Sequence, residues 1–319
     1  MKQLWQNLKK PIFVLAPMED VTDTVFRRIV CSCGRPDVLF TEFTSTEGMC
    51  SAGYKEVGKR LVFTEDERPL IAQIWGEKPE FFKQATQMLV KMGFDGIDIN
   101  MGCPEKSVLK KGACSALIKN HKLASEIIKA VQSEAGHLPV SVKTRIGFES
   151  IMTEEWIGFL LTHDLDALTI HARTVKEMSE VPAHWEEVKK AVEIRDRMDK
   201  KTVIIGNGDI SSREEALMRI KETGADGVMI GRGIFKDPWI FNPNHHSDQV
   251  TFDEKVIKLK EHMMLFESEW GERKSYAILK KFVKCYITGV PHASDVRVKL
   301  METKKYAEAY EVLDSLISS

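Results

Sequence analysis

The sequence of 319 residues contains no apolar run near the roughly 20 residues that a membrane-spanning helix needs. The apolar stretch between Pro11 and Pro17 is also too short for the core of a secretion signal. Cysteine is scarce: six thiols stand at positions 31, 33, 50, 103, 114 and 285, and no CxxC pair occurs. This excludes a disulfide scaffold and argues against a zinc site. We therefore expect a cytoplasmic protein with reduced thiols, no membrane contact and no bound metal.

Neither sign of charge dominates, because 46 basic residues face 47 acidic ones for a net charge of −1. This excludes a uniformly basic nucleic-acid-binding protein, although it allows one local basic face. Hydrophobic residues make up 43% of the chain and charged residues 29%, which excludes a disordered or collagen-like chain. The length suits one large domain or two ordinary ones, and nothing in the sequence argues against a monomer.

Eight short apolar runs recur along the first three-quarters of the chain, each followed by a turn and a helical stretch. They are near-continuous rather than alternating, as is typical of strands buried on both faces. Helix-boundary signals fall between them, such as Pro79 before Gly93 and Ser212 before Gly224. The runs are Phe13–Ala16, Val38–Thr41, Leu70–Ile74, Gly96–Asn100, Val140–Lys143, Ala167–His171, Val203–Gly206 and Gly227–Ile230.

Eight such units in roughly 240 residues predict an eight-stranded parallel β/α (TIM) barrel over residues 1–245. The alternative is an open doubly wound sheet, which usually has fewer strands and a glycine-rich first turn. Here the first turn, residues 16–20, contains no glycine.

From residue 246 to residue 319 the pattern predicts only helices, which we interpret as a small C-terminal helical domain, with His245 and His246 in a solvated linker. The expected helices are Phe252–Trp270, Lys274–Ile287, Ser294–Leu300 and Thr303–Ile317.

Polar or glycine residues follow the buried runs. The carboxyl ends of barrel strands converge on the active site, so one ligand could satisfy all of these groups. The alternative, that strand ends simply meet water, suits any single residue better than it suits the whole set. The residues are Pro17, Met18, Glu42, Gln73, Asn100, Cys103, Lys143, Arg145, His171, Arg173, Asn207, Gly208, Asp209, Gly231 and Arg232.

The last two strand ends predict a phosphate-bearing cofactor. Barrels commonly bind phosphate there on backbone amides and a helix N-terminus, and glycines let the backbone approach closely. Arg232 would add a charge-assisted contact, whereas ordinary turn glycines are the alternative. A buried Lys143 also needs an anionic partner, for which a reduced flavin is one candidate. His171 could contact that ligand or be a structural histidine.

Cys103 lies in a Gly/Pro loop after the fourth strand. A thiol is mostly protonated at neutral pH, so it can donate a proton or act as a nucleophile. The alternative is a small buried hydrophobic residue, which is our interpretation of Cys31, Cys33, Cys50, Cys114 and Cys285.

These strand ends, in this order, resemble the tRNA-dihydrouridine synthase family of the bacterial, FMN-dependent type. The resemblance covers the whole predicted barrel and continues more weakly beyond it. No one segment is specific, but their combination is highly specific. The matching segments are residues 16–18 (APM), 72–74 (AQI), 98–104 (DINMGCP), 141–147 (SVKTRIG), 168–174 (LTIHART), 206–210 (GNGDI) and 229–233 (MIGRG).

The resemblance implies that NADPH or NADH reduces FMN, that the flavin passes hydride to C6 of a tRNA uracil, and that Cys103 protonates C5. It places Asn100 and Arg145 at the target base. The positions that it implies for FMN are Pro17, Met18, Glu19, Gln73, Lys143, His171, Asn207, Gly208, Asp209, Gly231 and Arg232.

The family also implies tRNA binding by the helical domain. Residues 273–305 hold nine basic residues and two acidic ones, and the spacing of positions 273, 274, 280, 281 and 284 lets them share much of one helix face. Such a face binds phosphates with little sequence preference, although a charge run is more often a solvated face. The expected tRNA contacts are Lys280, Lys281, Lys284 and Arg297.

The sequence departs from the family at three places. Cys114 stands where many members have glycine, residues 175–183 lack the usual glycine, and Glu19 and Asp20 add negative charge after Met18. Two other functions remain open at this point. One is an FMN barrel acting on a free pyrimidine or enoate, and the other is a flavin-free RNA-binding protein.

Overall fold

The computed structural model describes residues 3–244, 249–289 and 292–317, so the predicted domain boundary and the pair His245 and His246 lie outside the described residues. Each of the eight predicted runs overlaps an observed strand, and a two-residue strand, β3, is additional. The strands are β1 (Ile12–Leu15), β2 (Leu39–Phe40), β3 (Thr44–Ser45), β4 (Leu70–Trp75), β5 (Gly96–Met101), β6 (Val140–Arg145), β7 (Ala167–His171), β8 (Val203–Asn207) and β9 (Gly227–Ile230).

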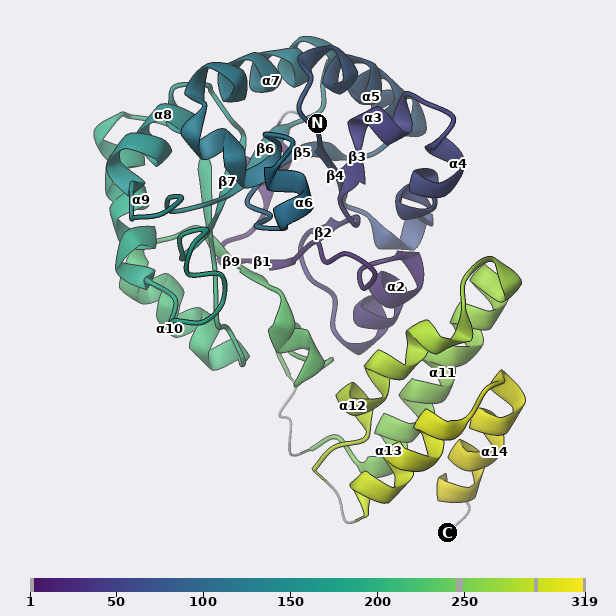
Figure 1. Ribbon diagram of the computed structural model, residues 1–319. Helices are drawn as coiled ribbons and strands as arrows, with labels where there is room; N and C mark the ends of the chain where they lie inside the picture. Colours follow the sequence, from purple (N-terminus) through teal and green to yellow (C-terminus); the bar gives the residue numbers. More distant parts are fainter. Residues whose placement is uncertain (1–2, 245–248, 290–291, 318–319) are drawn as a thin grey trace.

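The strands form one parallel sheet in the order β1-β9-β8-β7-β6-β5-β4-β2, with β3 also paired to β4. A bridge between Val14 and Val38 joins the two ends of this order and closes the ring. The predicted β/α barrel is therefore confirmed, and Figure 1 shows its helices arranged around the ring.

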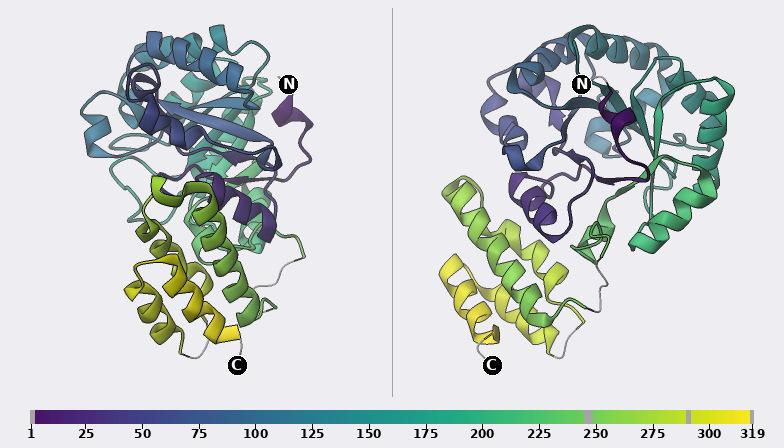
Figure 2. Two further views of the ribbon diagram at one scale, coloured as in Figure 1. Left: turned by 90° about the vertical axis from the view of Figure 1, so that its right-hand side faces the viewer. Right: turned by 180° about the vertical axis from the view of Figure 1, so that it is seen from behind.

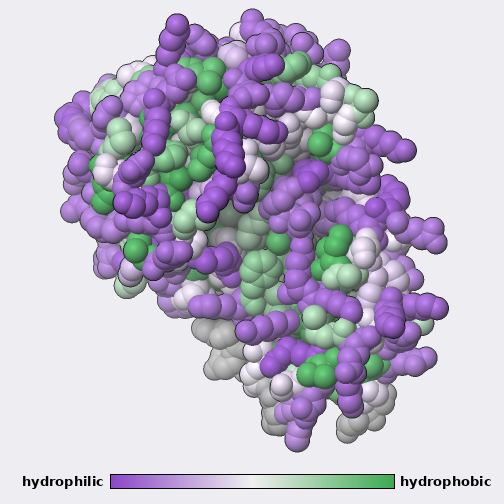
Figure 3. All heavy atoms as spheres, viewed as in Figure 1, coloured by the Kyte–Doolittle hydropathy of each residue, from purple (hydrophilic) through white to green (hydrophobic). Residues whose placement is uncertain are grey.

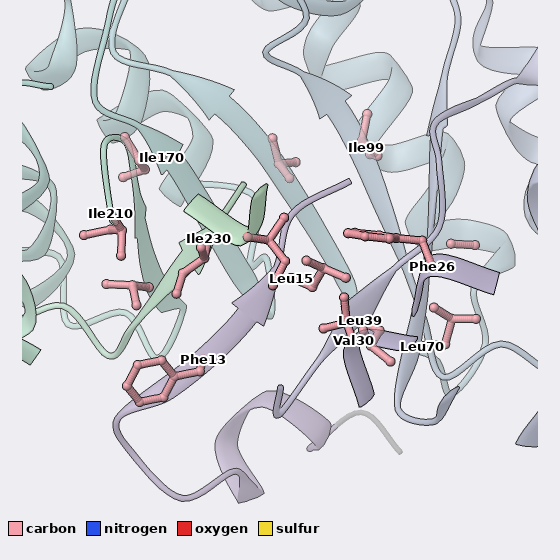
Figure 4. Close-up of a cluster of buried hydrophobic side chains, with 14 of the residues drawn as sticks. Phe13, Leu15, Phe26, Val30, Leu39, Leu70, Ile99, Ile170, Ile210 and Ile230 are labelled. Atoms are coloured by element: carbon pink, nitrogen blue, oxygen red, sulfur yellow. The ribbon is translucent and has the colours of Figure 1, made fainter. Parts of the chain in front are cut away.

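Successive side chains of a strand point to opposite faces, so each strand contributes to two apolar layers. Phe13 and Leu15 of β1 belong to the large cluster between the strands and the helices, which Figure 4 shows in part. Ile12 and Val14 belong instead to a smaller cluster that also contains the β9 residue Met229. This alternation explains why the runs are apolar throughout.

The first helix lies across the ring on the side away from the active-site loops (Figure 2, right). Trp5 of this helix is completely buried in the smaller cluster, so its indole fills the end of the barrel opposite the site.

Two helices begin and end at the residues that the sequence predicted. The helix that starts with Pro79 ends at Gly93, which is left-handed (φ 80°), and Ser212 caps the helix that ends at Gly224 (φ 71°). The helices are α1 (Leu4–Asn7), α2 (Thr24–Cys33), α3 (Thr46–Met49), α4 (Tyr54–Val57), α5 (Pro79–Met92), α6 (Lys106–Leu109), α7 (His121–Glu134), α8 (Gly158–Leu161), α9 (Trp185–Arg197), α10 (Arg213–Thr223), α11 (Phe252–Trp270), α12 (Val283–Tyr286), α13 (Ala293–Glu302) and α14 (Tyr306–Ile317).

The helical C-terminal region lies beside α2 (Figures 1 and 2). Phe26 of α2 stacks on Phe282 with ring centroids 4.9 Å apart. Asp23, just before α2, accepts hydrogen bonds from Trp270 Nε1 at 2.9 Å and Lys274 Nζ at 2.8 Å. Within the described residues, no helix is long and apolar enough to cross a membrane.

The helical segment predicted over residues 274–287 is confirmed from Tyr276 to Tyr286, but not as a single α-helix. The segment starts with an extended Lys274, continues as a 3₁₀ helix from Tyr276 to Phe282, and only then becomes α12. Lys274 forms an ion pair with Asp23 of the barrel, and the Ser275 side chain caps the 3₁₀ helix that follows. Arg273 and Lys274 therefore lie outside the helical part that carries Lys280, Lys281 and Lys284.

Candidate active site

A cavity of about 600 Å³ opens at the carboxyl ends of β1, β6, β7, β8 and β9. This is the size of a typical small-molecule site. Figure 3 shows the same face hollowed near its centre, with hydrophilic side chains around the hollow. The lining residues are Ala16, Pro17, Met18, Lys143, His171, Arg173, Ser179, Asn207, Gly208, Asp209, Ile210, Ser211, Met229, Gly231, Arg232, Gly233 and Lys236.

Most residues predicted to bind the cofactor line this cavity, but two of the described ones do not. Glu19 instead forms an ion pair with Arg60, and Gln73 is fully buried. Ser179 and Lys236 also line the cavity, and no sequence signal marks them because neither follows a strand directly. Arg173, which stands at a strand end, is a further lining residue with no predicted role.

The cavity is strongly cationic, since Lys143, Arg173, Arg232 and Lys236 line it with a single carboxylate, Asp209. Asp209 forms an ion pair with Arg173 and lies 3.8 Å from Arg232 Nη2, so both guanidinium groups are held at the same wall. Such a wall favours a ligand that carries a phosphate group.

Lys143 and His171 line the cavity among these cationic side chains. Burial, together with the nearby Arg145, lowers the pKa of Lys143 to about 8, and its Nζ donates to Asn207 Oδ1 at 3.3 Å. Burial and the surrounding cations hold the pKa of His171 well below its usual range. Arg173 Nη1 lies 3.1 Å from His171 Nε2, so a neutral His171 accepts this hydrogen bond. An anionic ligand would relieve the repulsion among these groups.

Steric reasons require glycine in the two turns that follow β8 and β9. A Cβ atom on Gly233 would lie 2.2 Å from the Ile210 carbonyl oxygen, and Gly208 has a φ of 139°. Glu215 accepts hydrogen bonds from the Ser211 amide and hydroxyl at 2.8 Å each, so these two groups are not available to a phosphate. Any phosphate would therefore contact the turns and the arginines rather than the amide of Ser211.

A chain of buried hydrogen bonds crosses β4 and β5 towards the Cys103 loop. Asp98 accepts from Gln73 Nε2 at 2.7 Å, and Gln73 Oε1 accepts from Asn100 Nδ2 at 3.0 Å. Asn100 Oδ1 then accepts from the backbone amides of Gly102 and Cys103, each at 3.0 Å. Asn100 was predicted to bind the target base and Gln73 the cofactor. In the structure they are hydrogen-bonded to each other, and Asn100 holds the Cys103 loop.

Cys103 is half-buried in this loop and packs against Trp75 and Cys114. A hydrogen bond from the Cys114 thiol lowers the pKa of Cys103 to about 7, against the burial that would raise it. This corrects the expectation of a mostly protonated thiol, because the pKa of Cys103 lies close to neutral pH. Cys33, Cys114 and Cys285 are buried as expected, whereas Cys31 and Cys50 are partly exposed.

Arg145 ties two loops together at the edge of the site. Its Nε donates to the Gly102 carbonyl at 2.9 Å, and its Nη1 donates to the carbonyls of Thr174 and Met178 at 2.9 and 2.8 Å. This predicted base-contacting residue is only 4% exposed, and burial lowers its pKa to about 10. The bonds connect the Cys103 loop to the segment after β7.

The basic residues predicted to contact tRNA are spread over different environments. Lys281 Nζ donates to the Asp20 carbonyl of the barrel, and Lys280 Nζ donates to the Met301 carbonyl at 2.6 Å. Arg297 Nη1 donates to the Ile287 carbonyl at 2.9 Å. Lys284 is exposed on α12.

A family model described as "Dihydrouridine synthase (Dus)" matches residues 14–319. A relative from Staphylococcus aureus (strain COL), named "Probable tRNA-dihydrouridine synthase", is 46% identical over 98% of this chain and 95% of its own. A relative from Bacillus subtilis (strain 168), named "Probable tRNA-dihydrouridine synthase 2", is 44% identical over 98% of this chain and 96% of its own.

Solved structures share the fold at low sequence identity. Histamine dehydrogenase from Rhizobium sp. 4-9 superposes with a TM-score of 0.54 at 13% identity, over 79% of this chain and 48% of that one. 2-Naphthoyl-CoA reductase gives a TM-score of 0.55 at 12% identity, over 74% of this chain and 52% of that one. This likeness supports the barrel alone.

Proposed function

The chain belongs to the dihydrouridine synthase family, and from this premise we infer that it is a tRNA-dihydrouridine synthase, which reduces the C5–C6 double bond of uridines in tRNA. The observation that carries the proposal at this site is the pairing of a cationic cavity with the thiol of Cys103 on the adjoining loop. A barrel that binds RNA without chemistry would not need the thiol of Cys103 on this loop.

The cavity fits an FMN group. Arg173 and Arg232 would hold the phosphate beside the Gly231–Gly233 turn, where a side chain on Gly233 would displace the backbone. Lys143 would face the ring, because a buried ammonium needs an anionic partner and a reduced flavin carries negative charge near N1. When bound, the flavin takes two electrons from NADPH or NADH and supplies a hydride to C6 of uracil.

Cys103 would donate the proton that C5 needs once charge develops towards O4 of the base. Asn100 and Arg145 hold its loop through the backbone, so the sulfur is positioned before substrate arrives. A thiol with a pKa near 7 still carries its proton on about half of the molecules at neutral pH, whereas an ordinary carboxylic acid would not.

The target base must leave its stack in folded tRNA, at a cost of a few kcal/mol that other contacts offset. The C-terminal helical region, with Lys284 exposed on α12, is the proposed source of phosphate contacts. Lys281 is joined to the barrel loop that follows β1, so this region and the mouth of the cavity would contact one bound tRNA.

The test uses purified protein and tRNA from cells that lack the gene. The wild type should be yellow and should form dihydrouridine in tRNA but not from free uridine, which separates it from a barrel acting on small pyrimidines. Cys103→Ala should keep the flavin absorbance and lose product. A colourless protein that takes up no added FMN would refute the proposal, and full activity of Cys103→Ala would refute the assigned proton donor.

Charge reversal at Lys284 tests the RNA surface. Lys284→Glu should weaken tRNA binding and make the affinity less dependent on salt, because one phosphate contact and its counterion release are lost, while flavin content stays the same. Lys189→Glu, on the exposed surface of α9, is the matched control. Equal affinities of the two variants would remove Lys284 from the tRNA-binding surface.

A further inference from the structure

Two thiols meet beside the mouth of the barrel. Cys103 comes directly after β5, and Cys114 begins the 3₁₀ helix that runs to Lys119. The Cys114 thiol donates a hydrogen bond to the Cys103 sulfur, and both side chains pack in one small cluster with Val108. The sulfur atoms are therefore neighbours in the folded chain.

The loop between them holds this contact and can also adjust. Ser115 Oγ donates to the Cys103 carbonyl at 2.7 Å, which ties the two ends of the loop together. Gly112, two residues before Cys114, has a φ of 78°, and a Cβ atom built on it would meet nothing within 4 Å. Glycine tolerates a wide range of backbone dihedrals, so the loop can adjust at Gly112 while a disulfide forms.

The two sulfurs differ in access and in acidity. Cys103 is half-buried and partly ionised near pH 7, so it is the sulfur that an oxidant can reach and that can attack it. Cys114 is 1% exposed, and burial holds its pKa well above the usual range. This is the arrangement of an attacking thiolate beside a sheltered second thiol.

We propose that Cys103 and Cys114 form a reversible disulfide on exposure to a hydroperoxide, and that this modification stops the reduction of tRNA. The loss of activity rests on the proposed role of Cys103 as proton donor, whereas the formation of the disulfide does not.

The chemistry proceeds in two balanced steps. The Cys103 thiolate attacks one peroxide oxygen, the O–O bond breaks, and the departing hydroxide takes up a proton, which leaves Cys103 as a sulfenic acid. Cys114 sulfur then attacks Cys103 sulfur, the S–O bond breaks, and water leaves with the Cys114 proton. Two thiols lose two electrons and two protons, and one hydrogen peroxide becomes two waters.

Cys114 would protect Cys103 from irreversible oxidation, in addition to making the loss of activity reversible. A sulfenic acid with no thiol beside it is oxidised further to sulfinic and sulfonic acids, which thiol reductants do not reverse. A disulfide with Cys114 stops this sequence at a stage from which a dithiol restores both thiols.

Peptide mapping tests the bond directly. The full-length protein is treated with hydrogen peroxide, free thiols are blocked with N-ethylmaleimide, and trypsin cuts after Lys91, Lys106, Lys111 and Lys119. Peptides 92–106 and 112–119, each with one cysteine, should appear as a linked pair that lacks two hydrogens and separates on reduction. Activity should fall as this pair forms and return with dithiothreitol.

Two variants sharpen the result. After peroxide, Cys114→Ser should give a 92–106 peptide that gains oxygen atoms, with activity that dithiothreitol does not restore. Cys31→Ser, which removes a partly exposed thiol in α2, should form the linked pair as the wild type does. Even if Cys114→Ser does not fold, the mapping of the wild type decides the question.

The outcomes separate the two proposals. If Cys103 of the treated wild type is recovered as a blocked thiol, as a sulfonic acid or linked to another cysteine, the disulfide is refuted. If the linked pair forms fully while tRNA is still reduced at the original rate, the role of Cys103 as proton donor is refuted.

Discussion

Asp98→Asn should disorganise the Cys103 loop although residue 98 touches neither the loop nor the cavity. The Asp98 carboxylate can only accept, so Gln73 must turn its amide nitrogen towards it and its oxygen towards Asn100. Asn100 in turn must present its oxygen to the backbone amides of Gly102 and Cys103. Asparagine at 98 offers a donor as well as an acceptor and removes the reason for this orientation.

The size of the effect follows from the two bonds at the end of the chain. Each amide hydrogen bond contributes about 0.5–1.5 kcal/mol, so losing both removes about 1–3 kcal/mol that favours the ordered loop. The equilibrium constant for ordering the loop then falls by roughly 5- to 150-fold. We expect the kcat of tRNA reduction to fall by up to this factor, while KM for tRNA changes little because phosphate contacts lie elsewhere.

Unfolding stability is the wrong assay for this variant. Burial raises the pKa of Asp98 to about 6, so the ionised carboxylate destabilises the fold above pH 6 by roughly 3 kcal/mol. Asparagine removes this buried charge, which stabilises the fold, but it also disrupts the oriented hydrogen bonds, which destabilises the fold. The two effects on the unfolding free energy are of similar size and opposite sign. The difference in unfolding free energy between variant and wild type should therefore be small at pH 7 and should shift against the variant below pH 6.

Alkylation of Cys103 by iodoacetamide gives a direct measure. The wild-type rate should rise with a midpoint near pH 7, and that of Asp98→Asn should move towards the ordinary thiol range. Ser141→Ala is the matched control, because it removes a 2.6 Å bond to the other carboxylate oxygen and leaves the acceptor that faces Gln73. Identical profiles for Asp98→Asn and the wild type, or an equal shift in Ser141→Ala, would refute the reasoning.

Three further predictions concern the thiol, the cavity and the contact with the helical region. The kcat/KM of tRNA reduction should fall as pH rises through about 7, because Cys103 loses its proton there, and a rate that rises through this range would contradict its role as an acid. Lys143→Met should lower FMN retention after gel filtration at least several-fold, whereas Lys129→Met on exposed α7 should retain the cofactor, and equal retention would remove Lys143 from the FMN site. Asp23→Ala should lower the unfolding free energy in urea by about 1.5–3 kcal/mol, since Trp270 and Lys274 lose their shared acceptor, and a change near zero would contradict that role.

The sequence by itself determined the architecture, because local patterns suffice for it. Each barrel strand is buried on both faces, so its apolar run is visible without knowledge of its partners. Pro79 and Gly93 mark the ends of one helix by their own backbone preferences, and Gly231–Gly233 marks a turn that tolerates no side chain. Strand order then places the residues after each run at one mouth.

Only the tertiary structure decided which of those residues face the cavity and which hold one another. Gln73 and Asn100 carry the same signal as Asn207, but they are bonded to each other and to the Cys103 loop. Lys274 forms an ion pair with Asp23, about 250 residues away in sequence, and lies outside the helical segment that begins at Tyr276. The pKa of Cys103 depends on Cys114 across a folded loop. Hydrogen bonding and charge act through space, so these features follow from distances that no local pattern records.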